Sequence, residues 1–422
     1  MAMRENLPLW RNRIFSKLWF SQIFTQIGTE ISLFALPIFA ITQLHITPIQ
    51  MGYLVFSEQM APILLGIFSG IFIDRHNPLK IMIFSEVFRA LILICIFVLF
   101  CFSQAGFFTL FISVFLLGSG SGKLFFDVSY RKLLPGLFKP SEIVQCNAKL
   151  ASANSLSELL GPVIAGCMIK LFSAADALFF NVIFFLLSSL FLLLLKKIKI
   201  EIVKEKRNSR LSSVYTGYQF VFKTPLLRII TFSGAVWNFC YALVYTIFIF
   251  YAVNQLKISP FMLSLVFIPG AIGVLVGASL IPVMIKKFGY GNSLLFGVAI
   301  TGVWGLILSL LQPVEWVIFA IGIAFFFFGL GQTVFNVINV SINQIVIPSH
   351  LLGKVIASLR VLFCMTIPLG ALASGYLAQA RSPREAIFIA TLGLMFSAFI
   401  LALPQVRQFK LEAPVHPAES DV

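Results

Sequence analysis

Charged side chains are scarce in this sequence. Only 11% of the 422 residues are Asp, Glu, Lys or Arg, whereas an ordinary soluble domain has about 25%. Apolar residues reach 59%, and the mean hydropathy is +0.98. Regular alternation of polar and apolar residues is also lacking, which disfavours a lipid-facing barrel. The composition therefore excludes a typical soluble domain and indicates an all-α polytopic membrane protein.

Catalytic and cofactor motifs are missing as well. The four histidines fall in expected loops or tails, the six cysteines show no metal-type spacing, and no glycine-rich phosphate loop is visible. An enzyme needs convergent catalytic groups, so we expect no enzyme activity, no metal or other cofactor, and no ATP-driven mechanism. The first apolar run lacks the shape of a signal peptide, and we expect it to be retained.

Long apolar runs dominate what is present. A spanning helix needs about 20 mostly apolar residues, and the chain supplies a dozen such runs separated by short polar turns. The expected spans are 18–41, 50–73, 80–101, 107–128, 148–170, 177–195, 227–251, 261–284, 291–311, 315–338, 353–378 and 385–404. The sequence thus predicts twelve transmembrane helices.

Lys and Arg are concentrated in every second loop. The segment 196–228 carries nine of them, while the turns near 42–49, 102–106 and 312–314 carry none. Cytoplasmic loops keep an excess of Lys and Arg, so the pattern predicts a cytoplasmic (inner) membrane protein with both termini in the cytoplasm. Three basic residues are modest exceptions: Lys257, Arg381 and Arg384. The net charge of +15 then indicates contact with anionic lipid headgroups rather than nucleic acid.

A short charged turn follows the second expected span. It begins Gly70-Ile-Phe-Ile-Asp74-Arg75 and continues to Lys80. The pattern resembles the cytoplasmic loop between the second and third helices of the major facilitator superfamily. Gly70 permits close helix approach, and Asp74 at a helix end can bond backbone amides or a basic side chain. The resemblance implies that these residues form a conformational latch between the two halves of a carrier.

The chain also repeats itself. Gly118 and Pro135 are echoed by Gly329 and Pro348, an offset close to half the chain. Transporters of the superfamily consist of two similar six-helix halves with a binding site between them. We therefore expect an N-terminal half, a basic cytoplasmic linker, a C-terminal half and a cytoplasmic tail, at 1–195, 196–226, 227–404 and 405–422.

Several segments resemble one branch of the superfamily, which contains macrolide-efflux proteins and the enterobactin (siderophore) exporter. They include Arg11-Asn12-Arg13, the run from Gly28 to Pro37, Arg89, Leu134-Pro135 and Pro368-Leu369-Gly370. In the fifth span, Gly161, Pro162 and Gly166 are similar to a Gly-Pro element of drug–proton antiporters, although Ala165 replaces an expected Gly. The resemblance implies export, but a kink and tight packing also explain these residues.

Three glutamates lie near the middle of expected spans, where a charge is costly and often functional. Glu30 is near the middle of the first span, with Gln22 and Gln26 at helical spacing before it. A parallel column is formed by Ser21, Thr25 and Thr29. We expect this polar face to border a wet cavity, where Glu30 can carry a proton. Glu58 and Glu158 are further proton-coupling candidates, and for all three a structural partner is the alternative. Glu86 and Arg89 are spaced as an intrahelical pair.

The second half offers amides and aromatic rings in place of acids. Candidate cavity residues are Trp237, Asn238, Tyr241 and Tyr245 in the seventh span and Gln332, Asn336 and Asn339 in the tenth. The resemblance implies that these helices line the cavity, and such groups suit a bulky amphipathic ligand. Arg360, if turned into the cavity, would attract an anionic cargo. Polar contacts between helices are the structural alternative.

The sequence as a whole predicts a secondary efflux transporter. We expect it to export a small amphipathic molecule, such as a siderophore or a hydrophobic drug, by alternating access, with the proton gradient as energy source. A lysophospholipid carrier of the same fold is the main alternative, and a small-molecule importer or a membrane enzyme is less favoured. The expected partners are the substrate and the lipid bilayer, and the sequence leaves open whether an outer-membrane export partner exists.

Overall fold

The computed structural model describes residues 12–120, 123–138, 140–195 and 210–409, and within these residues every element is a helix. The N-terminal elements are α1 Arg13–Gln43, α2 Pro48–Arg75, α3 Pro78–Cys101, α4 Phe107–Phe115, the π-helix η2 Leu116–Gly120, α5 Lys123–Leu137, α6 Pro140–Leu171 and α7 Ala174–Leu193. The others are α8 Arg210–Lys223, α9 Pro225–Asn254, α10 Pro260–Leu265, α11 Phe267–Leu310, α12 Val317–Val346, α13 Ser349–Ala380, α14 Pro383–Leu401 and α15 Pro404–Arg407.

Short polar turns set where the helices begin. The Oδ1 of Asn12 accepts a hydrogen bond from the amide of Ile14 (3.0 Å), and Thr47 forms a capping box with Gln50 at the start of α2. Asn77 caps α3 in the same way, with Pro78 in the first turn. Such caps satisfy amides that have no partner inside the helix. The apolar runs therefore start at defined positions.

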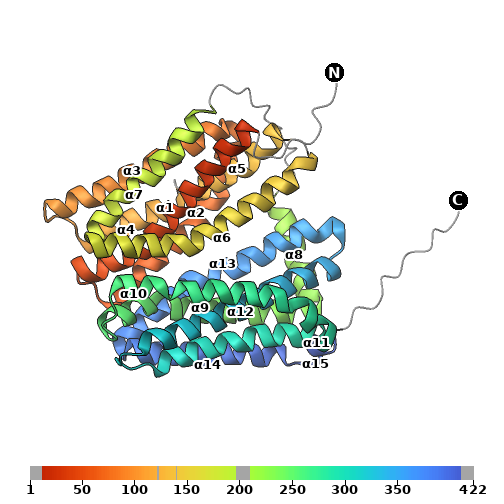
Figure 1. The fold of residues 1–422 in the computed structure, drawn as a ribbon. Coiled ribbons are helices and arrows are strands. Elements are labelled where there is room, and N and C mark those ends of the chain that lie inside the picture. The colour runs from red at the N-terminus through yellow and green to blue at the C-terminus, as the bar shows by residue number, and fades with distance from the viewer. Residues whose placement is uncertain (1–11, 121–122, 139, 196–209, 410–422) are drawn as a thin grey trace, which may run out of the picture.

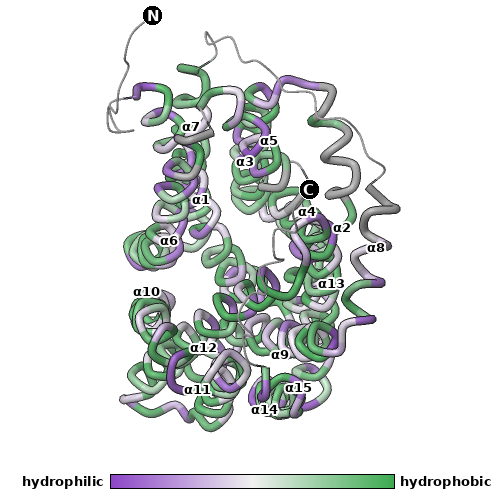
Figure 2. Tube along the Cα trace, turned by 90° about the vertical axis from the view of Figure 1, so that its right-hand side faces the viewer, coloured by the Kyte–Doolittle hydropathy of each residue, from purple (hydrophilic) through white to green (hydrophobic). Residues whose placement is uncertain are grey.

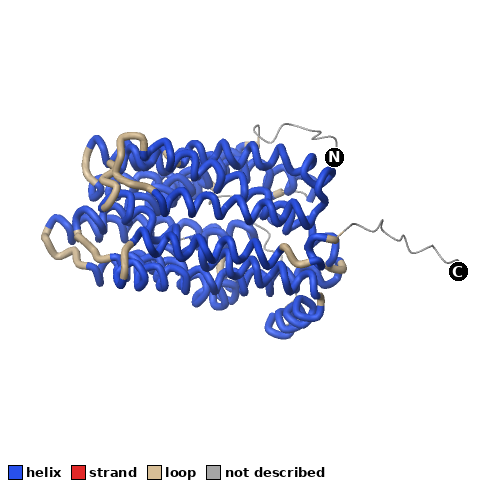
Figure 3. Tube along the Cα trace, turned by 90° about the horizontal axis from the view of Figure 1, so that it is seen from below, coloured by secondary structure: helices blue, strands red, loops and turns tan. Residues whose placement is uncertain are grey.

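The helices run along one common direction and the loops gather at the two ends of the bundle (Figure 3). In Figure 1, α1 to α7 form an upper group and α9 to α15 a lower group. Within the upper group α1 packs on α6 and α7, and within the lower group α9 packs on α13 and α14. This grouping is compatible with two halves, and the half boundaries stay a prediction.

Among the described residues, eight helical stretches are long and apolar enough to cross a membrane. One of them, Pro260–Leu310, contains two of the predicted spans. Gly289 separates these spans, because its φ of 77° breaks the helix and is a conformation that glycine adopts at little cost. The predicted spans on α2, α4–α5 and α6 lie on helices outside this set of eight. The count of twelve therefore stays a prediction.

The two groups of helices meet along α2 with α13 and along α6 with α10 (Figure 2). A Cβ atom at Gly52 would lie 2.8 Å from the carbonyl oxygen of Ala371, so only glycine allows this approach. Nearby, the hydroxyls of Tyr53 and Tyr376 are 2.6 Å apart. The Lys170 ammonium on α6 lies 4.4 Å above the ring of Phe261. These contacts all lie at one end of the bundle, at the starts of α2 and α10 and the ends of α6 and α13.

The predicted basic linker contains a helix in its second part. Residues 196–209 lie outside the described residues, and α8 follows from Arg210. α8 packs against the first half of α13, where Gly217 is in contact with Lys354 and Ser358. The linker therefore contacts the C-terminal group of helices at the end of the bundle opposite to the Gly52 contact.

Candidate functional site

A central cavity separates the two groups of helices. It has two adjoining chambers, which we name the Glu58 chamber (about 370 Å³) and the Glu30 chamber (about 330 Å³). Both are lined by Leu33 of α1 and by Tyr241, Tyr245 and Ile249 of α9. The cavity is thus shared between helices that are far apart in the sequence.

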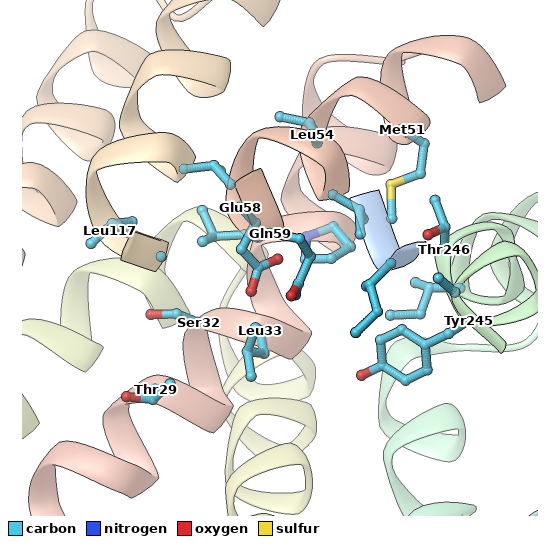
Figure 4. A pocket seen from close by; sticks show the side chains of 18 of the residues that line it. Thr29, Ser32, Leu33, Met51, Leu54, Glu58, Gln59, Leu117, Tyr245 and Thr246 are labelled. Atoms are coloured by element: carbon cyan, nitrogen blue, oxygen red, sulfur yellow. The ribbon is translucent and has the colours of Figure 1, made fainter. Parts of the chain in front are cut away.

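The upper helices contribute the acidic wall of the cavity. Glu58 of α2 lines one chamber, and Glu30 of α1 and Glu158 of α6 line the other. Figure 4 shows Glu58 and Gln59 pointing into the pocket, opposite Tyr245 and beside Ser32 and Leu33 of α1. Three carboxyl groups from three helices therefore border two adjoining chambers.

Glycines hold two of these glutamates at close helix crossings. A side chain at Gly161 of α6 would collide with Cβ of Glu30. Similarly, a Cβ at Gly118 of η2 would lie 2.8 Å from Cγ of Glu58 and 3.1 Å from its carbonyl oxygen. Because each neighbouring helix presents only a hydrogen atom at this point, the backbones of Glu30 and Glu58 are fixed by packing.

The lower helices contribute an aromatic wall. Tyr241 stacks on Trp237 with ring centroids 5.3 Å apart and on Phe328 at 5.4 Å. Trp237 is only 4% exposed and donates from Nε1 to Oγ1 of Thr301 (2.8 Å). The buried Trp237 ring therefore packs against Tyr241 and holds the tyrosine ring in place at the chamber wall. Tyr241 and Tyr245 present their aromatic groups to the chambers, where they offer flat contact surfaces and hydroxyls.

The structure brings together only part of the predicted cavity set. Gln332 joins Glu30, Glu158 and the two tyrosines in lining a chamber. The other candidates are not among the residues that line the two chambers: Gln22, Gln26, Trp237, Asn238, Asn336, Asn339 and Arg360. Gln22 and Gln26 are buried, whereas Asn336 and Arg360 are exposed. Asn238 donates to the Gly234 carbonyl of its own helix, and Asn339 accepts from Asn343 at 3.5 Å.

Several lining residues were missed by the sequence reasoning. They are Ser32, Met51, Gln59, Arg89, Thr246 and Phe267. Two signals could have found some of them: Ser32 follows Thr29 at helical spacing, and Gln59 is adjacent to Glu58. Met51, Thr246 and Phe267 carry no comparable signal, because their neighbours depend on how the helices pack.

The predicted Gly-Pro element of α6 has packing contacts on both sides. Gly161 meets Glu30, Pro162 lines the Glu30 chamber, and Gly166 meets Ser264 of α10. These contacts agree with the structural explanation of the element, namely a helix that packs closely on two neighbours. They do not decide the direction of transport.

The predicted latch turn is described in its backbone and at its edges. Only the backbone is described at three of the predicted latch residues, Gly70, Asp74 and Arg75. The fourth, Lys80, is exposed. The Lys132 ammonium of α5 donates to the carbonyl of Ile73 (2.8 Å). A cation at a helix C-terminus stabilises its free carbonyls, so the end of α2 is tied to α5.

Inside the upper group, Glu86 and Arg89 of α3 form the predicted pair. Nη1 of Arg89 lies 3.6 Å from Oε1 of Glu86, and the two side chains are 2% and 0% exposed. Arg89 also donates from Nη2 to Oγ1 of Thr29 (2.6 Å). Because Thr29 and Arg89 also line the Glu58 chamber, the buried pair adjoins the cavity.

A bundle of long apolar helices with a central cavity between two groups of helices is the architecture of a polytopic membrane carrier. The chain belongs to the Major Facilitator Superfamily, whose sequence profile it matches over residues 18–371. It is also 29% identical over 225 residues to the uncharacterized MFS-type transporter YfiS of Bacillus subtilis (strain 168). The matched part spans about half of each chain, 52% of both.

Solved structures share the whole fold. The nucleoside transporter NupG superposes with a TM-score of 0.74 at 14% identity, covering 92% of this chain and 98% of that one. A bacterial homologue of the iron transporter ferroportin, in its inward-facing state, gives 0.71 at 15% identity, with 92% and 98% covered. At these identities the likeness extends to the fold alone. Family membership places the chain among membrane transporters rather than enzymes.

Proposed function

We propose that the chain exports an amphipathic small molecule across the cytoplasmic membrane in exchange for protons, by alternating access. The observation that carries this proposal is the central cavity, in which three carboxyl groups face an aromatic wall. Intramembrane carboxyls are costly and typical of proton relays. Aromatic walls with a few polar groups are typical of sites for bulky ligands.

The cavity is closed at one end of the bundle, as expected of an exporter that is about to bind substrate from the cytoplasm. The Gly52 and Tyr53 contacts close one end of the bundle, and the distribution of Lys and Arg predicts that this end faces outside. The ferroportin homologue supports the same assignment, because its inward-facing state superposes with a TM-score of 0.71 and its outward-facing state with 0.57. Substrate would then enter from the cytoplasm.

Glu30 is the proposed coupling carboxyl. It lies where α1 crosses α6, and it lines a chamber together with Glu158, Tyr241 and Tyr245. When the cavity opens outward, Glu30 would take up a proton from the outer side. When the cavity opens inward, Glu30 would release the proton to the cytoplasm, and the next substrate molecule would then bind in the cavity. Glu58 and Glu158 are the further coupling candidates.

The substrate is proposed to be a hydrophobic drug or a siderophore, as the resemblance to the macrolide-efflux and enterobactin-exporter branch implies. The test compares cells that carry and lack the protein, under iron starvation and with a panel of hydrophobic antibiotics. Loss of secreted iron chelator with unchanged drug tolerance identifies a siderophore exporter. Drug sensitivity with normal secretion identifies a drug exporter. If neither measurement changes, both proposed cargos are contradicted, and a lipid carrier becomes the favoured function.

A further inference from the structure

The Glu86–Arg89 pair is not satisfied in the way a purely structural ion pair would be. Neither carboxylate oxygen of Glu86 accepts a hydrogen bond of good geometry, and Nε and Nη1 of Arg89 also have no hydrogen-bond acceptor. The two groups are joined only by the 3.6 Å contact between Oε1 and Nη1. A buried ion pair offsets its desolvation only with good geometry and further hydrogen bonds, and buried polar groups are normally bonded.

The surroundings of Glu86 are polar but almost neutral. The hydroxyls of Thr25 on α1 and Ser188 on α7 lie beside the carboxyl group. Asp127 of α5 is the further acidic group whose charge acts on both Glu86 and Arg89. The described residues of α4 and η2 are uncharged. Glu86 can therefore be an anion paired with Arg89, or a neutral acid that donates to a hydroxyl.

Hydroxyl groups of α1 and α7 surround this pair. Thr29, at the wall of the Glu58 chamber, accepts from Arg89 and donates to the Thr25 carbonyl (2.7 Å). The Thr25 hydroxyl is 2.7 Å from that of Ser188, which is 2.9 Å from that of Ser21. Because Thr29 donates to a backbone carbonyl, the hydroxyls of Thr25, Ser188 and Ser21 form a separate group beside Glu86, and the chamber is reached by Thr29 and Arg89.

The Arg89 guanidinium lies between Glu86 and the Glu58 chamber, whose wall it helps to form. Its central carbon lies 3.9 Å above the ring of Phe185 on α7, and its Nη2 is held by Thr29. The ring and the hydroxyl keep Arg89 in place independently of Glu86. A change in the charge of Glu86 would therefore leave the cation at the chamber wall.

We propose that Glu86 is a proton-binding site inside the N-terminal group of helices, and that Arg89 transmits its charge to the Glu58 chamber. Glu86 takes up a proton at an Oε atom when it becomes neutral and releases it when it pairs with Arg89 as an anion. With Glu86 neutral, the Arg89 cation loses its counter-charge and the chamber wall becomes more positive. This site is separate from Glu30 and does not depend on which cavity carboxyl drives transport.

The test is infrared spectroscopy of the purified full-length protein in an ester-free detergent while the buffer is stepped from acid to alkaline pH. We expect the carbonyl band of protonated carboxyl groups to fall as the pH rises. Glu86→Gln should remove one carboxyl group's share of this change, and Glu86→Asp should restore a titrating band. Glu385→Gln is the matched control, because Glu385 is 54% exposed in a surface pair with Arg381.

Three results would overturn the proposal. They are an identical titration in Glu86→Gln and wild type, a Glu86 band that persists at every pH, and a Glu86 band that is absent at every pH. If Glu86→Gln does not fold, Arg89→Lys replaces it and should shift the midpoint of the same band, and an unshifted midpoint contradicts the proposal. No transport is measured, so failure of the proposed export function would leave this result unaffected.

Discussion

Gly161 lies against the side chain of Glu30 where α6 crosses α1. The collision that any side chain at Gly161 would make with Cβ of Glu30 shows that the position of the carboxyl group depends on the absence of a single methyl group. The same holds more weakly for Glu58 and Gly118, where the approach is 2.8 Å. At the scale of residues, the site is therefore as sensitive to its glycines as to its acids.

Gly161→Ala should reduce stability and transport together. The added methyl group must push α1 from α6 or rotate Glu30, and overpacking of this kind costs about 1–3 kcal/mol. Thermal unfolding of the detergent-solubilised protein measures the loss. Gly353→Ala in α13 is the matched control, because nothing lies within 4 Å of a Cβ there, and it should leave stability unchanged or slightly raised. Equal melting temperatures for both variants would contradict the packing argument.

Glu30→Gln should abolish transport driven by a pH gradient while the protein remains inserted. The amide keeps the size of the side chain and its contact with α6 but cannot release a proton. Flux of an identified substrate into liposomes is measured with and without the gradient, and Glu385→Gln serves as the exposed control. Full gradient-driven activity in Glu30→Gln would remove Glu30 from the coupling role.

At the scale of elements, α2 with α13 and α6 with α10 form the contacts that close one end of the bundle. Gly52 and Gly375 bring the backbones of α2 and α13 together, and Tyr53 and Tyr376 join them by a hydrogen bond. Such contacts must break if the two groups of helices rock about the central cavity. They are therefore suited to control the balance between the two open states.

Gly52→Leu should shift the protein toward the state open at this end. The leucine side chain has no room here, because even a Cβ added at Gly52 would lie 2.9 Å from Cα of Gly375. Overpacking of about 1–3 kcal/mol corresponds to a shift of about 5- to 150-fold in the equilibrium. Spin-label distances between the start of α2 and the end of α13 measure the two populations, with Gly353→Leu as control. An unchanged distance distribution would show that this contact does not control opening.

At the scale of the whole molecule, the cavity has an acidic wall from the upper helices and an aromatic wall from the lower ones. Rocking of the two groups would change the distance between these walls and so the environment of each carboxyl group. In the proposed mechanism, coupling between proton and substrate needs no direct contact between them, because both would bind in the central cavity. The orientation of the bundle in the membrane decides which side each state faces.

The predicted orientation is testable by labelling. In a variant without the native cysteines, Gln104→Cys in the loop after α3 should react with a membrane-impermeant maleimide in intact cells. His76→Cys, in the turn between α2 and α3, should react only after the membrane is opened. Both native side chains are exposed, so access depends on the membrane alone. The opposite labelling pattern would reverse the orientation and the proposed direction of transport.

The sequence by itself determined the fold class and the superfamily, and it singled out three mid-span glutamates as proton-coupling candidates, a role that stays a prediction. Apolar runs of span length leave the chain few alternatives to helices, because backbone groups in lipid must be satisfied within each segment. A charge within such a run is also visible without any structure, which is why Glu30, Glu58 and Glu158 were all found.

Only the tertiary structure decided which polar groups meet. Helical spacing gives the direction of a side chain on its own helix, but the neighbour in that direction depends on how distant segments pack. Ser21, Thr25 and Thr29 accordingly border the buried Glu86–Arg89 pair of α3 and Ser188 of α7, although their spacing predicted a cavity face. Thr29 alone among these three also lines a chamber. The positions of the cavity glutamates likewise depend on glycines of helices that are distant in the sequence, Gly161 for Glu30 and Gly118 for Glu58.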